Sequence, residues 1–114
     1  MRRSARLWLE DIVSNGQDVL EFIEGKSLED YESDKALRAM VERKLFAVGE
    51  AVARLRDGFP ETYRRLTDSP EIIGFRNILA HGYFALEHHR VFDIALNSVP
   101  LLVSEASELL THEN

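Results

Sequence analysis

Residues 34–57 read DKALRAMVERKLFAVGEAVARLRD, and this stretch gives the clearest indication of the fold class. Its apolar residues recur at alternating spacings of three and four over roughly seven turns, which predicts one apolar face on an α-helix. That apolar stripe comprises Leu37, Val41, Lys44 or Leu45, Val48, Val52 and Leu55. The opposite face carries charge, at Arg38, Glu42, Arg43, Glu50 and Arg54. Glu50 precedes Arg54 by four residues, the order that favours a stabilising pair. Gly58 and Pro60 should then end the helix.

The preceding residues predict a second amphipathic helix at 4–24. Ser4 is a suitable N-cap, and Gly25 follows where the left-handed conformation commonly ends a helix. The buried stripe should comprise Leu9, Ile12, Gly16, Val19 and Ile23. Residues 26–32 are polar and predict a loop. Ser33 is expected to cap the long helix, with Asp34 in its first turn.

Two further main helices and one short helix or turn are expected after Pro60. A short helix or turn at 61–67 precedes a helix at 71–81, which Pro70 opens and Gly82 ends. The last helix, 87–110, contains Pro100, which should kink or break it. Its stripe comprises Val91, Ala95, Val99, Leu102, Ala106 and Leu109. Strand-like alternation is missing from the sequence. We therefore predict an all-α fold, an antiparallel four-helix bundle with an additional short helix and a kinked last helix, in a single domain at 1–114.

The composition narrows the classes of function. The chain has 114 residues, 45% hydrophobic and 30% charged, which is typical of a folded domain. Its net charge of −6 disfavours loose, charge-driven binding to nucleic acid or anionic membranes, but a locally basic site stays open. Cysteine is absent, which excludes disulfides, cysteine metal sites and thiol nucleophiles. The basic N-terminus meets Glu10 and Asp11 before any apolar run, so we expect no signal peptide, no membrane partner and a cytoplasmic location.

Residues 75–84, FRNILAHGYF, concentrate polar groups within an apolar stretch. On a helix, Asn77 and His81 share a face, and Arg76 is long enough to reach the same region. Tyr83 follows just beyond. A histidine moves protons near neutral pH, and an arginine stabilises charge on phosphate, so this set suits metal-free phosphodiester cleavage. Because one chain offers one such histidine, separate acid and base groups would be easier if two protomers met here.

A structural interpretation of the same residues stays open. In it, His81 caps the helix carbonyls and Arg76 pairs with a carboxylate, for which Glu50 is one candidate. Trp8 and Phe22 are interpreted as core or dimer contacts rather than ligand stackers. The adjacent histidines after Glu87 lack the usual i,i+4 ligand spacing, so no metal site is predicted.

Residues 71–84, EIIGFRNILAHGYF, resemble the signature of the HepT-like toxins of the HEPN superfamily. That signature is an arginine, often followed by asparagine, then four to six residues and a histidine, with a tyrosine two residues later. Arg76, His81 and Tyr83 match it. Residues 22–31, FIEGKSLEDY, and 37–55, LRAMVERKLFAVGEAVARL, are similar to the family's first loop and second helix, so the resemblance covers about 8–110. Gly82 stands where glutamate is common in relatives.

The resemblance implies an all-α homodimer whose two motifs meet at the interface. It implies a metal-independent endoribonuclease without a cofactor, the toxin of a type VII-like toxin–antitoxin system acting on RNA such as tRNA or mRNA. Arg76 and His81 would be catalytic and Asn77 a supporting polar residue. Tyr83 would receive AMP from a minimal nucleotidyltransferase antitoxin, which blocks RNA access. Two alternatives stay open: a non-catalytic nucleotide-binding or accessory subunit of a nucleotidyltransferase complex, and a structural helical dimer.

Overall fold

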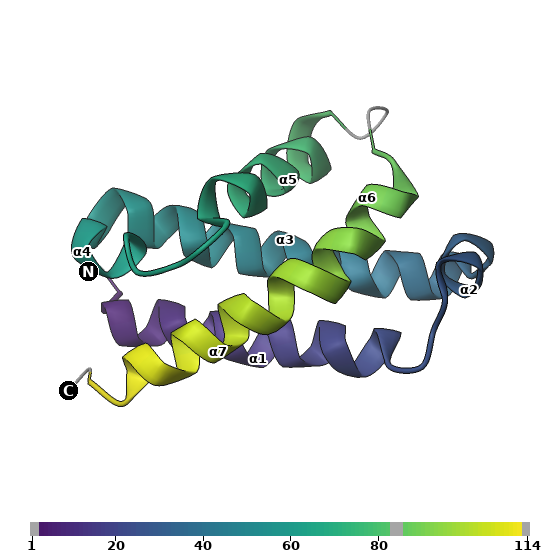
Figure 1. Ribbon diagram of the computed structural model, residues 1–114. Coiled ribbons are helices and arrows are strands. Elements are labelled where there is room, and N and C mark those ends of the chain that lie inside the picture. Colours follow the sequence, from purple (N-terminus) through teal and green to yellow (C-terminus); the bar gives the residue numbers. More distant parts are fainter. Residues whose placement is uncertain (1–2, 83–85, 113–114) are drawn as a thin grey trace.

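Helices form all the regular secondary structure in residues 3–82 and 86–112, the parts of the chain that the computed structural model describes. In chain order they are α1 (Ala5–Ile23), α2 (Leu28–Ser33), α3 (Lys35–Gly58), α4 (Pro60–Tyr63), α5 (Ser69–His81), α6 (His88–Asp93), the π-helical η2 (Ile94–Ser98) and α7 (Val99–Leu110). The all-α prediction is confirmed, with two short helices, α2 and α4, where one was expected (Figure 1).

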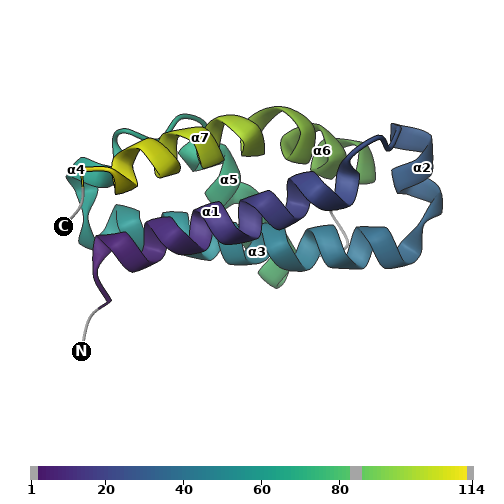
Figure 2. The same ribbon diagram turned by 90° about the horizontal axis from the view of Figure 1, so that it is seen from below.

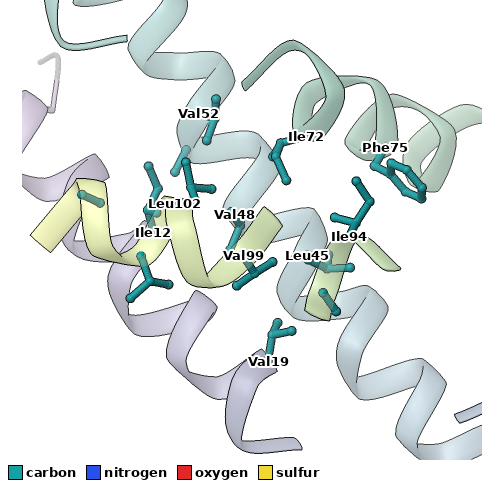
Figure 3. Close-up of a cluster of buried hydrophobic side chains, with 14 of the residues drawn as sticks. Ile12, Val19, Leu45, Val48, Val52, Ile72, Phe75, Ile94, Val99 and Leu102 are labelled. Atoms are coloured by element: carbon teal, nitrogen blue, oxygen red, sulfur yellow. The ribbon is translucent and has the colours of Figure 1, made fainter. Parts of the chain in front are cut away.

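The bundle is built around α1 and α3, which run antiparallel and pack against each other (Figure 1). The last helix returns across α1, and α5 packs on α3 (Figures 1 and 2). Side chains from all four elements meet in one core, where Ile12, Val48, Ile72 and Leu102 point toward one another (Figure 3). The predicted stripes of α1 and α3 are buried in this core, with Leu45 inside rather than Lys44.

Two glycines allow helices to approach closely. A Cβ added at Gly16 would lie 2.4 Å from Cγ2 of Val103, so the glycine allows α1 to lie close to α7. A Cβ added at Gly49 would lie 2.4 Å from Cβ of Arg76 and 3.3 Å from the carbonyl oxygen of Ile72. These distances are too short for any other residue type, so Gly49 fixes how closely α5 approaches α3.

The prediction of a loop at 26–32 is wrong, because α2 begins there. Ser27 and Asp30 form a capping box: the Asp30 N–H donates to Oγ of Ser27 at 3.1 Å, and the Ser27 N–H donates to Oδ2 of Asp30 at 2.9 Å. Ser33 ends α2 instead of capping α3. The cap of α3 is Asp34, whose Oδ1 accepts from the N–H of Leu37 at 3.0 Å.

The other helix ends largely follow the sequence. Ser4 caps α1, and Gly25 has a φ of +73°, both as predicted. Gly82 ends α5 as predicted, although its φ of −126° is not left-handed. Glu42, expected on the exposed face of α3, is buried, with 7% of its surface exposed.

Where a kink or break was predicted in the last helix, the structure has a π-helical turn, and the chain stays helical from His88 to Leu110. Pro100 lies in the first turn of α7, directly after the π-helical turn η2. The N–H of Val99 reaches back five residues to the carbonyl of Ile94, the spacing of a π-helix. Proline cannot donate the next bond of the series, so the α-helical ladder is interrupted here. Among the described residues, no helix is long and apolar enough to cross a membrane.

Candidate active site

Arg76 lies on α5 and is held by side chains on two helices. Its Nε and Nη2 donate to Oε1 of Glu50 on α3, at 3.0 and 2.5 Å. Its Nη1 donates to Oδ1 of Asn77 at 2.8 Å. The guanidinium carbon also lies 5.7 Å from the centre of the Phe46 ring, within the range of a cation–π contact. A quarter of the Arg76 side chain remains exposed, so the group is fixed in position but accessible from solvent.

Glu50 connects two arginines through its two carboxylate oxygens. Oε1 accepts from Arg76, and Oε2 accepts from Nε of Arg54 at 2.8 Å. The hydrogen bond from Arg76 is the largest cause lowering the pKa of Glu50, and the bond from Arg54 adds to it, so the carboxylate stays ionised near neutral pH. Two cations and one anion leave this arginine–glutamate–arginine cluster with one net positive charge in a chain whose total is −6.

Asn77 and His81 occupy exposed positions one turn apart on α5. Arg76 was expected to reach the region of Asn77 and His81, and its side chain contacts Asn77. Within the described residues, no hydrogen bond joins His81 to Arg76 or Asn77. The N–H of Gly82, rather than the imidazole, satisfies the carbonyl of Ile78 at the helix end, at 2.9 Å. Tyr83 lies outside the described residues.

The structural interpretation of Arg76 required a pair with a carboxylate. The structure contains this pair, between Arg76 and Glu50. It is also compatible with chemistry, because it presents the guanidinium beside Asn77 and leaves it partly exposed. In the ranges 3–82 and 86–112, no group of three or more histidine, aspartate or glutamate side chains could hold a metal ion.

The sequence missed two supporting residues. Gly49 is needed because a Cβ there would collide with Arg76. In the sequence it appears as a glycine inside a strongly helical pattern and lies in the stretch 37–55 that resembles the family's second helix. The sequence suggested no role for Phe46 in the site, yet its ring lies under the guanidinium of Arg76. Phe46 precedes Glu50 by four residues, so the two side chains lie on the same face of α3.

Proteins similar to this chain carry the name of a "Putative RNase". One from Caldanaerobacter subterraneus subsp. tengcongensis is 31% identical over 111 residues, which cover 97% of this chain and 98% of the relative. Two from Methanocaldococcus jannaschii are 28% identical over 109 residues (96% of this chain, 89% of the relative) and 30% identical over 104 residues (91% and 94%). No solved structure matches the chain significantly.

The family model for HepT-like ribonucleases matches residues 12–109, a range that includes α3, α5 and the whole cluster around Arg76. This match covers most of the chain, and the chain therefore belongs to the HepT-like ribonuclease family.

Proposed function

We propose that this protein is a metal-independent endoribonuclease, the toxin of a type VII-like toxin–antitoxin system. The observation that carries the proposal is the Arg76 guanidinium, which Glu50 and Asn77 hold in an accessible position on the same helix as His81. Membership of the HepT-like ribonuclease family and the names of the relatives support RNA as the substrate, with tRNA and mRNA as the candidate classes.

The reaction needs a base, an acid and a stabiliser of negative charge. His81 takes the proton from a ribose 2′-hydroxyl, and the 2′-oxygen attacks the adjacent phosphorus. The bond from phosphorus to the 5′-oxygen breaks, and that oxygen receives a proton from the His81 of a second copy. Arg76 stabilises the charge that builds on the phosphate oxygens. The products are a 2′,3′-cyclic phosphate and a free 5′-hydroxyl. This division of labour is the reason for proposing a homodimer with a composite site.

We further propose control by an antitoxin at Tyr83, two residues after His81, because the resemblance to HepT-like toxins implies that this tyrosine is modified. In the proposed step, the tyrosine oxygen attacks the α-phosphorus of ATP, pyrophosphate leaves, and AMP stays on the tyrosine. A minimal nucleotidyltransferase antitoxin would catalyse this transfer. The added phosphate is negative and would compete with RNA for Arg76, so the modified toxin should not cleave.

The test combines cleavage, growth and mass. The purified chain is incubated with total tRNA and with mRNA in the presence of EDTA, beside Arg76→Ala, His81→Ala and the surface control Arg65→Ala. Cleavage by wild type and by Arg65→Ala alone is the expected result. Cleavage that survives both site substitutions would refute the assignment.

Co-expression with a nucleotidyltransferase encoded beside the gene should restore growth and add an AMP-sized mass to the purified toxin. The same experiment on Tyr83→Phe should show neither effect. Restored growth with no change in mass would show that the antitoxin acts by another route.

A second candidate is a non-catalytic nucleotide-binding or accessory subunit of a nucleotidyltransferase complex. It is favoured by one observation: in the described part of a single chain, the Arg76 guanidinium is hydrogen-bonded to Glu50 and Asn77 and not to His81. It predicts tight binding of a nucleotide without cleavage of any RNA.

A further inference from the structure

A surface hollow of about 460 Å³ lies beside the arginine–glutamate–arginine cluster, between the start of α1 and the end of α3. Its walls are formed by Arg3, Trp8, Glu50, Arg54, Asp57, Gly58 and Phe59. Glu50 and Arg54 belong both to this wall and to the cluster that holds Arg76. The hollow therefore adjoins the candidate active site through Glu50, and its volume lies within the ordinary range of small-ligand sites.

The walls of the hollow suit a flat, partly apolar ligand. Trp8 and Phe59 are only partly buried and both line it. The guanidinium carbon of Arg3 lies 4.1 Å from the centre of the Trp8 ring, so these two planar groups are in contact. Unpaired bases of single-stranded RNA stack on aromatic rings and on arginine planes of this kind.

The charges of the hollow favour a base with a phosphate at its edge. The two arginines and two carboxylates of the lining give it a formal charge of zero. Arg54 pairs with Glu50 inside the hollow, whereas Arg3 pairs with Asp11 and Asp57 with Arg56, both outside it. A bare phosphate would gain little from such a site, whereas stacking does not require net charge. Arg54 is tied through Nε to Glu50, and 56% of its side chain is exposed, so a phosphate can reach it from solvent.

We propose that this hollow binds one nucleobase of the RNA substrate against Trp8, Arg3 and Phe59, with Arg54 contacting the phosphate next to that base. The proposal rests on the ribonuclease function proposed above and adds a subsite beside the bond that Arg76 and His81 cleave. It also changes the interpretation of Trp8, which sequence alone placed in the core or a dimer contact.

The chain offers an internal reporter, because Trp8 is its one tryptophan. The His81→Ala variant, expected to bind without cleaving, is titrated with a single-stranded hexa-adenylate while tryptophan fluorescence is recorded. We expect saturable quenching. Phe59→Leu should weaken binding by about tenfold, the order of one base–aromatic stack. Arg54→Gln should weaken binding of the oligonucleotide more than that of adenosine, which has no phosphate.

The matched control for Arg54→Gln is Arg38→Gln, an arginine on the same helix about 24 Å away. It should leave the quenching unchanged. A second readout covers the case in which Phe59→Leu fails to fold: in the cleaving protein, Trp8→Leu should raise KM for RNA with kcat little changed, while Trp8→Phe should retain most of the affinity.

The outcomes separate this subsite from the function it rests on. RNA cleavage that requires Arg76 but produces no saturable quenching would overturn the subsite and leave the ribonuclease in place. Quenching that is equal in the Phe59→Leu, Arg54→Gln and Arg38→Gln proteins would also overturn it. Saturable quenching without any RNA cleavage by wild type would uphold the nucleotide site and refute the nuclease.

Discussion

Gly49→Ala and Gly74→Ala place the same extra methyl group inside two helices, and the structure predicts opposite effects on stability. In a helix interior, alanine is favoured over glycine by about 1 kcal/mol. At Gly74, apart from its chain neighbours and the backbone of its own helix, no heavy atom of the described residues lies within 4 Å of the added carbon, so this gain should appear in full. Gly74→Ala is therefore expected to stabilise the protein.

At Gly49 the added carbon would lie 2.4 Å from Cβ and 3.0 Å from Cγ of Arg76, and 3.3 Å from a backbone oxygen. The position of a Cβ is fixed by its own backbone, so a change of rotamer cannot relieve the clash and α5 must move. Overpacking of this kind costs about 1–3 kcal/mol. The helix preference is common to both variants and cancels, so Gly49→Ala should be less stable than Gly74→Ala by about 1–3 kcal/mol.

The measurement is urea denaturation followed by circular dichroism, with Trp8 fluorescence as a second probe. Both variants should keep the m-value of wild type. Because Arg76 is the residue displaced, Gly49→Ala should also cleave RNA more slowly, while Gly74→Ala should not. Coincident denaturation curves for the two variants would refute the close approach of α5 to α3.

Three further predictions concern the same network and its supports. Glu50→Gln should lower the free energy of unfolding at pH 7 by about 1–2 kcal/mol, because charged hydrogen bonds from two arginines are lost. Arg76 lowers the pKa of Glu50 in the folded state, so the stabilisation by Glu50 is present above its pKa in the unfolded chain and is lost as the pH falls through its pKa in the folded protein. Denaturation curves of wild type and Glu50→Gln should therefore converge in acid and stay apart at neutral pH. Arg76→Lys should lower kcat for RNA cleavage by about 10²-fold, because a lysine ammonium lacks the planar set of N–H donors that can bind Glu50 and a phosphate together. Cleavage rates at saturating RNA measure this effect. Asp34→Ala should destabilise the fold by about 1 kcal/mol through loss of the α3 cap, and thermal melts beside Ser33→Ala, which should have a smaller effect, check it.

The long helices were predictable because their apolar residues repeat over many turns. The stripe from Leu37 to Leu55 is buried as the spacing indicated. The six-residue α2 was missed because a helix of that length has too few turns to show a period. Its signal was local, in the Ser27 and Asp30 capping box, and the polar composition of the segment outweighed it.

The candidate site was predictable only as far as one helix extends. Asn77 and Arg76 are neighbours in sequence, and their contact follows from local geometry. The partner of Arg76 lies 26 residues away, so Glu50 could be named from sequence only as one carboxylate among several. The role of Gly49 could not be inferred from the sequence for the same reason. A glycine inside a helix is unfavourable by itself, and its role is evident only once α5 is seen to pack against it. In the proposed mechanism, the catalytic partner of His81 would come from a second chain, and no pattern within one chain can indicate that relation.

The acidity of the chain bears directly on how it would bind RNA. A net charge of −6 repels a polyanion at long range, and at physiological ionic strength this field is screened beyond about 8 Å. Binding must therefore come from contacts made within that distance. The cluster of Arg76, Glu50 and Arg54 supplies one local positive charge, and the neutral hollow beside it supplies stacking surface. An RNA held mainly in this way releases few counterions, so its affinity should fall only weakly with salt, unlike that of proteins that neutralise many phosphates. Pairing of two chains would double the local positive charge at a composite site and leave the rest of the surface acidic. Productive binding of RNA would then be confined to the place where both His81 side chains are available.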